Sequence, residues 1–151
     1  MTRRIGSRML AAAAALACGT AITFAQSAPP GSKDGKGAQI DDAKLQKRTR
    51  AVSCVNDSVT LDGVLLDASG GVPVQAVGCT VTIKNSHLKG MGGIQISGMS
   101  TVNIENSLIE GTTALQLTDG ADVSIKSSTI RGRIQRVGNV KLHDLGDNKW
   151  K

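Results

Sequence analysis

Apolar and polar residues alternate in a pattern that recurs four times from residue 59 onward. Each copy opens with a valine, a polar residue and an Ile or Leu, and its second apolar stretch follows a polar corner; the copies are VTLDGVLLDA from Val59, VTIKNSHLKG from Val81, VNIENSLIEG from Val102 and VSIKSSTIRG from Val123. A second triplet follows each copy, as VPV at Val72, IQI at Ile94, LQL at Leu115 and IQR at Ile134. Alternation with a period of two predicts short β-strands. Each unit therefore holds two or three of them.

A unit of about 21 residues cannot bury its own apolar face, so the copies are expected to stack. If each strand pairs with its counterpart in the next unit, the chain forms an all-β solenoid of about 4 to 5 turns, rising about 4.8 Å per turn. Stacking places apolar residues in inward columns, for example Val59, Val81, Val102 and Val123. The sequence thus predicts a narrow aliphatic core.

Two outward columns support this register because their charges alternate in sign. They are Asp62, Lys84, Glu105, Lys126 and Asp67, Lys89, Glu110, Arg131. Like charges directly opposite each other on adjacent strands are destabilising, so alternation is what a stacked register favours.

The motif V-x-I-x-N-S-x-I-x-G, as in Val102 to Gly111, resembles the repeat of right-handed parallel β-helix proteins, the pectin-lyase-like superfamily. The resemblance covers about residues 52–145. It implies three parallel sheets, with Asn85 and Asn106 in a structural ladder at the bend after the first strand, where Asn tolerates a left-handed conformation. A leucine-rich repeat is the alternative fold because the unit length fits it. The lack of a helical segment in the units favours the β-helix.

The first 39 residues differ in composition from the repeats. Residues 1–25 combine a basic stretch, TRRIGSR, with the run MLAAAAALA and small residues up to Ala25, which predicts a signal peptide for bacterial-type export to the periplasm or the medium. The run is too short for a membrane span. The triplet LAC ending at Cys18 leaves a lipid anchor as an alternative. Residues 26–39 are rich in Pro, Gly, Ser and Lys and are expected to be a flexible linker.

Residues 40–51 are predicted to form a short helix that caps the solenoid, which is expected to occupy residues 52–151. Asp41 and Asp42 stand at its start, and Lys47, Arg48 and Arg50 at its end, as the helix dipole favours. Solenoid ends expose strand edges, so a cap is needed.

The formal net charge of +6 does not indicate a nucleic-acid partner. Three basic residues lie in the signal peptide, residues 26–50 hold six basic against three acidic residues, and the remaining chain has nine of each. The repeats are therefore neutral. After export, Cys54 and Cys79 remain as an even pair in an oxidising compartment, and we expect them to form a disulfide.

Candidate catalytic groups are few. A polysaccharide hydrolase or lyase needs clustered acids, and the only candidate cluster is Asp119, Asp122 and Asp144. A tight turn at Gly120 is the simpler explanation for the first two. His87 and His143 lack further ligands at metal-binding spacing, so neither a metal nor a cofactor is expected.

Candidate binding residues are the arginines near the last full turns, Arg131, Arg133 and Arg136, which suit an acidic sugar or a carboxylate. A charged edge that blunts strand pairing is the alternative explanation. A Thr- and Ser-rich outer face, including Thr60 and Thr82, resembles ice-binding surfaces and gives a minor alternative.

These observations predict an exported, non-catalytic β-helix module with a structural or interaction role, whose partner is a glycan or an envelope protein. A polysaccharide-active lyase or hydrolase, or a subunit of one, is the alternative function.

Overall fold

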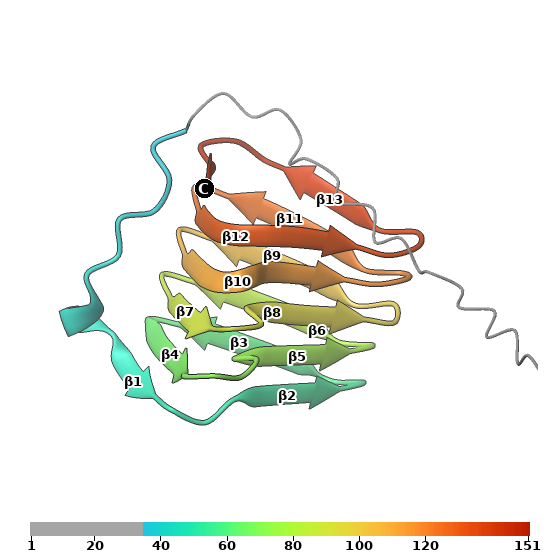
Figure 1. Ribbon diagram of the computed structural model, residues 1–151, viewed down its shortest axis with the longest axis horizontal. Coiled ribbons are helices and arrows are strands. Elements are labelled where there is room, and N and C mark those ends of the chain that lie inside the picture. Colours follow the sequence, from blue (N-terminus) through green and yellow to red (C-terminus); the bar gives the residue numbers. More distant parts are fainter. Residues whose placement is uncertain (1–34) are drawn as a thin grey trace, which may run out of the picture.

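The chain winds into a parallel β-solenoid of about five turns in the computed structural model, which describes residues 35–151 (Figure 1). The predicted all-β solenoid is therefore confirmed. The predicted signal peptide, Cys18 and most of the predicted linker lie outside the described residues. Within residues 35–151, no helix is long and apolar enough to cross a membrane.

Each of the first two turns contains three strands: β2 (Val52–Val55), β3 (Ser58–Asp62), β4 (Val64–Ala68), β5 (Val74–Val77), β6 (Thr80–Lys84) and β7 (His87–Gly90). In the later turns, β10 (Leu108–Leu117) and β12 (Thr129–Arg136) each combine the third strand of one turn with the first strand of the next. The other strands of these turns are β8 (Ile94–Ser97), β9 (Thr101–Glu105), β11 (Asp122–Lys126), β13 (Lys141–Asp144) and β14 (Lys149–Trp150).

All strand pairs are parallel, and each strand lies beside its counterpart one turn away. The order β13-β11-β9-β6-β3 forms a five-stranded sheet, and the remaining strands form a nine-stranded sheet. Val59 pairs with Val81, and Val81 with Val102, as the repeat alignment predicts. The inward columns are almost fully buried; none of Val81, Val102, Val123, Leu61, Ile83, Ile104, Ile125, Leu66, Leu88, Ile109 and Ile130 is more than 2% exposed.

The corner after each strand of the five-stranded sheet is held by two ladders of polar side chains. Asn106 Nδ2 donates to Asn85 Oδ1 at 2.8 Å, and Asn85 Nδ2 donates to Asp62 Oδ1 at 2.9 Å. Both asparagines have positive φ, 47° for Asn85 and 44° for Asn106, a conformation that Asn tolerates better than most residues. Beside them the buried hydroxyls of Ser107 and Ser128 accept hydrogen bonds from backbone N–H groups of the preceding turn.

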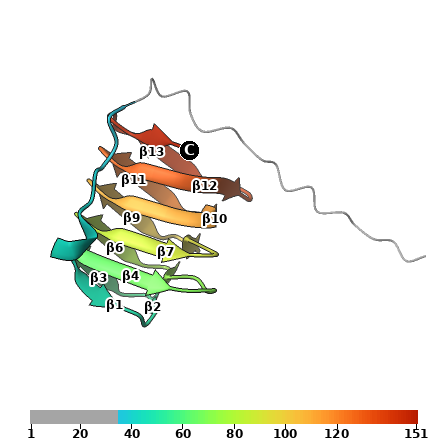
Figure 2. The same cartoon turned by 60° about the vertical axis from the view of Figure 1, so that its left-hand side comes forward.

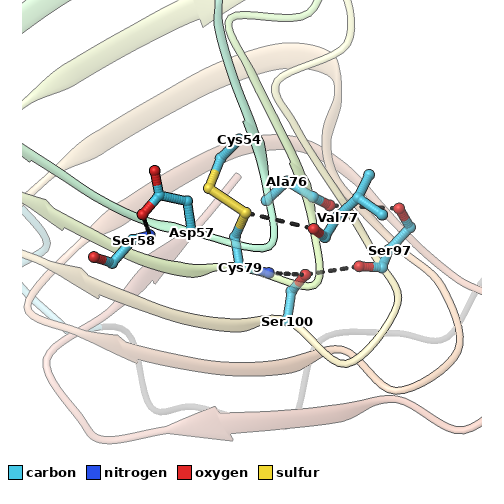
Figure 3. Close-up of a disulfide and its surroundings, with 8 residues drawn as sticks. All are labelled: Cys54, Asp57, Ser58, Ala76, Val77, Cys79, Ser97 and Ser100. Atoms are coloured by element: carbon cyan, nitrogen blue, oxygen red, sulfur yellow. Dashed lines mark hydrogen bonds between the residues drawn. A yellow bond between two sulfur atoms is a disulfide. The ribbon is translucent and has the colours of Figure 1, made fainter.

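The first two turns are joined by the predicted disulfide between Cys54 of β2 and Cys79, which follows β5 (Figure 3). Their Cα atoms are 6.2 Å apart, within the range that a disulfide spans. The Cys79 N–H also donates to Ser100 Oγ of the next turn at 3.1 Å. This bonding ties three successive turns together at one corner.

The predicted capping helix over residues 40–51 is not present. Only a single 3₁₀ turn, η1 (Asp42–Lys44), forms, and it is followed by the strand β1 (Gln46–Arg48). β1 pairs in parallel with β4, which would otherwise expose an unpaired edge. Charges that suit a helix dipole stabilise the chain by less than the backbone hydrogen bonds that β1 forms with the edge of β4. The tertiary contact therefore determines the local structure.

Residues 35–45 form an extended segment that runs along the side of the solenoid from its last turn to its first, and we call it the strap (Figures 1 and 2). At one end Gly35 and Gly37 donate backbone hydrogen bonds to Asn148 and Asp147, both at 3.1 Å. At the other end Gln46, just beyond the strap, donates to Gly63 at 2.8 Å. Residues 35–39, the last five of the predicted linker, belong to the strap.

Candidate functional site

The candidate site lies at the end of a column of charged side chains on the outer face of the nine-stranded sheet. Asp67, Lys89, Glu110 and Arg131 lie in register on successive turns. Arg131 Nη1 forms an ion pair with Glu110 Oε1. Since the signs alternate, each charge in this column has an opposite charge as its neighbour through four turns.

The fifth turn breaks this alternation. Lys151 donates its backbone N–H to Ile130 at 2.9 Å and accepts from the Gly132 N–H at 2.9 Å, which places it beside Arg131. Two cations are thus adjacent, and the one anion of this column near them, Glu110, pairs with Arg131 and lies on the side away from Lys151. Two further basic residues lie on these turns. Lys149 is paired with Thr129, and Arg133 follows Gly132 on β12.

We call Arg131, Arg133, Lys149 and Lys151 the basic corner. Arg131 alone among them forms an ion pair with another residue of the range 35–151. Arg133 and Lys151 are exposed, and Lys149 is half-buried. The corner can therefore offer three cations without breaking an existing ion pair.

Arg136, the third predicted binding arginine, lies apart from the other two. It pairs with Leu117 in register and so stands at an inward position at the end of the apolar column formed by Ala76, Ile96 and Leu117. Its Nε and Nη2 atoms are buried and have no hydrogen-bond partner within residues 35–151. Desolvation by burial lowers the pKa of Arg136 from its usual value. Arg131 and Arg133 therefore lie close together on β12, at the basic corner, whereas Arg136 lies at the end of the core.

The three candidate catalytic acids do not converge. Asp119 Oδ1 accepts from the Asn139 N–H at 2.9 Å, and Asp122 Oδ1 lies 3.2 Å from His143 Nε2. Asp144 takes the inward position opposite Ile125, where its Oδ1 accepts from Asn148 Nδ2 at 2.6 Å. Each carboxylate has its own structural contact. Within the described range, no group of three or more His, Cys, Asp or Glu side chains could hold a metal ion.

The outer face of the five-stranded sheet carries a shallow polar depression of about 400 Å³. Its floor includes Thr82, Asn103 and Ser124, which lie in register on β6, β9 and β11. Lys84 and Glu105 border it and form an ion pair of 3.5 Å, with both side chains 47% exposed. The charges on this face are therefore matched, unlike those at the basic corner.

His87 is the residue that the repeat pattern explains least, and the structure places it under the strap. Its Nδ1 lies 2.6 Å from Asp42 Oδ1 of the strap, and its Nε2 lies 2.9 Å from Glu110 Oε2. Its side chain is only 5% exposed. Glu110 thus joins two groups, since its other oxygen contacts Arg131 of the basic corner.

The pKa of Glu110 is lowered from its ordinary value. Burial alone would raise the pKa, but hydrogen bonds and charge interactions with His87 and Arg131 outweigh the desolvation. The carboxylate is therefore ionised at neutral pH and acts only as an acceptor.

The fold and these contacts define a parallel β-solenoid with a basic corner and a strap. No family model matches the chain, and no curated protein and no solved structure is significantly similar to it.

Several residues of the basic corner and of the contact between His87 and the strap could not be identified from the repeat pattern. Lys149 and Lys151 follow a tail that does not match the repeat motif, so their place beside β12 could not be read from spacing. Asp42 reaches His87 across 45 residues, outside any repeat register. The sequence contained one indication: His87 is the single ionisable residue in a column whose other members are Leu65, Leu108 and Thr129.

Proposed function

We propose that this protein is an exported, non-catalytic β-solenoid module that binds anionic polymers of the cell envelope or the extracellular space through the basic corner. The observation that carries this proposal is the position of Lys151 beside Arg131. There a column whose charges otherwise match ends in two cations.

The chemistry of the corner suits carboxylate or phosphate groups. A guanidinium such as that of Arg133 can bind such a group with two parallel hydrogen bonds, and lysine ammonium groups add charge. Cations on neighbouring turns are spaced by about 4.8 Å, so a polymer that lies along the solenoid axis meets more than one of them. Single exposed ion pairs contribute only about 0.2 to 1 kcal/mol, so binding depends on several contacts and weakens with salt.

The finer parts of the proposal rest on the sequence. The signal-peptide pattern of residues 1–25 supports export, and the disulfide between Cys54 and Cys79 is of the kind that persists in an oxidising compartment. The V-x-I-x-N-S-x-I-x-G motif supports a right-handed β-helix that resembles the pectin-lyase-like superfamily. Fold does not determine function, so the polymer is inferred from the charges and not from this likeness.

A polysaccharide lyase or hydrolase is the competing function, and it has less support. Such an enzyme needs an acid and a base on the two sides of one bond. Asp119, Asp122 and Asp144 instead have separate contacts with Asn139, His143 and Asn148.

Affinity electrophoresis in gels that contain polygalacturonate, with dextran as a neutral polymer, tests the proposal. The double variant Arg133→Ala/Lys151→Ala removes two exposed cations of the corner without breaking an ion pair of the described residues. We expect its affinity for polygalacturonate to fall about tenfold, equivalent to about 1.4 kcal/mol. Neither protein should be retarded by dextran.

The matched control is Lys84→Ala/Lys126→Ala, which removes the same charge from the opposite sheet. Its affinity should change less than about twofold, because those lysines lie in a column of alternating charges. Equal losses in both double variants would show that net charge alone matters, and absence of binding by the wild type would refute the proposal.

A further inference from the structure

The strap covers a column of side chains that point away from the core. Leu65, His87, Leu108 and Thr129 follow one another on successive turns and alternate with inward residues, yet they are only 3% to 9% exposed. Thr129 Oγ1 donates to the backbone oxygen of Ala38 in the strap at 3.2 Å. Since the strap also meets His87 at Asp42, the residues between these two contacts pass over Leu108.

His87 is the ionisable residue of this column. Both of its ring nitrogens lie within hydrogen-bond distance of a carboxylate oxygen, one from the strap and one from the solenoid. An ionised carboxylate only accepts hydrogen bonds, so two such contacts require a ring that carries a proton on both nitrogens. A neutral ring has one N–H, and its other nitrogen would then face a carboxylate with a lone pair.

The charged groups around His87 come from the strap and from four strands. Asp42 comes from the strap and Glu110 from β10, and Arg131 of β12 contacts the far oxygen of Glu110. Lys89 of β7 lies two residues along the same outer face, where Asp67 of β4 and Glu110 flank it in register. Asp41 and Lys44 of the strap pair with each other at 3.5 Å and are largely exposed. The nearest charges to the ring are thus the two carboxylates, and each of its nitrogens faces one of them.

We propose that Asp42, His87 and Glu110 form a proton-dependent clasp, which holds the strap on the solenoid while His87 is an imidazolium and loosens it when His87 loses a proton. Loss of the proton replaces one charge-assisted hydrogen bond by a repulsive contact in a site that little water reaches. The strap is held elsewhere by backbone hydrogen bonds at its two ends and by small contacts such as Ala38, so this middle contact has a large share in its docking.

Release of the strap has two physical consequences. Leu65 and Leu108 become exposed, which gives the nine-stranded sheet an apolar stripe on its outer face. The strap also leaves Asp147 and Asn148, next to Lys149 of the basic corner. The clasp therefore couples proton concentration to the surface of the molecule without any change in its core.

Hydrogen exchange followed by mass spectrometry on the full exported chain tests the clasp. The reporters are the amides of Gly35, Gly37 and Gln46, which donate to Asn148, Asp147 and Gly63. The internal reference is provided by peptides of the five-stranded sheet that include Thr101 and Asp122, whose amides donate to Cys79 and Ser100. Rates are divided by the intrinsic exchange rate at each pH.

In the wild type we expect protection of the strap amides to fall about tenfold as His87 loses its second proton, while the reference amides stay unchanged. In His87→Gln the strap should be loose at every pH, because the two N–H groups of Gln share one nitrogen and cannot replace donors at the two separate ring nitrogens. In Asp42→Asn the pH dependence should be reduced, because an amide can face either form of the ring. The control His143→Gln, on the opposite sheet, should behave as the wild type.

Two results would overturn the clasp. One is wild-type protection of the strap that does not change with pH while the His87 ring signals titrate in an NMR spectrum. The other is a change of equal size in the strap and the reference amides, which would indicate global destabilisation. The wild-type titration decides the matter even if His87→Gln fails to fold.

Discussion

Ser128 donates its backbone N–H to the side-chain Oδ1 of Asn148 at 2.8 Å, so an asparagine in the fifth turn does what a serine hydroxyl does in each of the three turns before it. Asn148 does more than the serines. Its Nδ2 donates to the Ile125 carbonyl at 2.8 Å and to Asp144, and its own carbonyl accepts from Gly35 of the strap. It thereby closes both the serine ladder and the end of the strap.

Replacement of Asn148 tests this role. Asn148→Ala leaves a buried N–H at Ser128 without its acceptor, whereas the Ile125 carbonyl keeps the Leu145 N–H as a donor, so we expect the free energy of unfolding to fall by about 1 to 3 kcal/mol. Asn148→Ser restores the acceptor for Ser128 and should lose about half as much. Urea denaturation followed by circular dichroism measures both. If the two variants are equally stable, the ladder does not depend on this acceptor.

Gly132 lies very close to the backbone of Gly111 in the preceding turn. A Cβ atom at Gly132 would lie 1.9 Å from the Gly111 carbonyl oxygen, and its φ is +130°. We expect Gly132→Ala to destabilise the fold by about 4 kcal/mol or more, which is exceptional for one methyl group.

The matched control for that variant is Gly63→Ala. Gly63 has a φ of +62°, but a Cβ there meets nothing within 4 Å. Only backbone strain of about 1 to 2 kcal/mol is expected. Thermal unfolding of both variants separates steric clash from strain, and similar melting temperatures would contradict the close approach at Gly132.

The disulfide between Cys54 and Cys79 should stabilise the first turns. It closes a loop with a sequence separation of 25 residues, for which the chain-entropy model gives about 3 kcal/mol. The double variant Cys54→Ser/Cys79→Ser should lose this stability, and a reducing agent should lower the urea midpoint of the wild type while leaving that of the variant unchanged. A midpoint of the wild type that does not respond to reduction would contradict the prediction.

Glu110 should contribute to the loss of stability in acid. Its pKa is lowered in the folded protein, so its contribution is fully present above its unfolded value of 4.5 and is lost as the pH falls from 4.5 through the lower folded value. Glu110→Gln should therefore be less stable than the wild type at neutral pH and should flatten this acid limb. Glu105→Gln is the control, since that side chain is 47% exposed. Parallel acid limbs in all three proteins would show that Glu110 is not the group involved.

The repeats could be predicted from the sequence because each inward position is repeated. Val81 alone says little, but Val59, Val102 and Val123 at equal spacing fix both its strand and its partner. The repeat also predicted the asparagine ladder at the bend of Asn85 and the position of Lys89 beside Asp67 on the adjacent turn.

The strap and the basic corner could not be predicted in this way, for a physical reason. Ala38 and Thr129 are separated by 91 residues and belong to no column, so only the folded chain brings them together. The charges of residues 41–50 favoured a helix, and the free edge of β4 selected a strand instead. Arg136 shows the same limit, since its place in the core column becomes apparent only from the shortened last unit.

The path of the strap also sets an order of events. Gly35, the first residue that the structure describes, is hydrogen-bonded to Asn148 in the last turn. During synthesis or export, the strap can therefore dock only after a segment that emerges much later in the chain. The middle turns can form from neighbouring contacts alone, but docking of the strap is a contact of very high sequence separation and is expected to be late and slow. A chain whose fifth turn has not formed would leave the strap without its anchor at Asp147 and Asn148, so an attached strap marks a molecule in which that turn is in place.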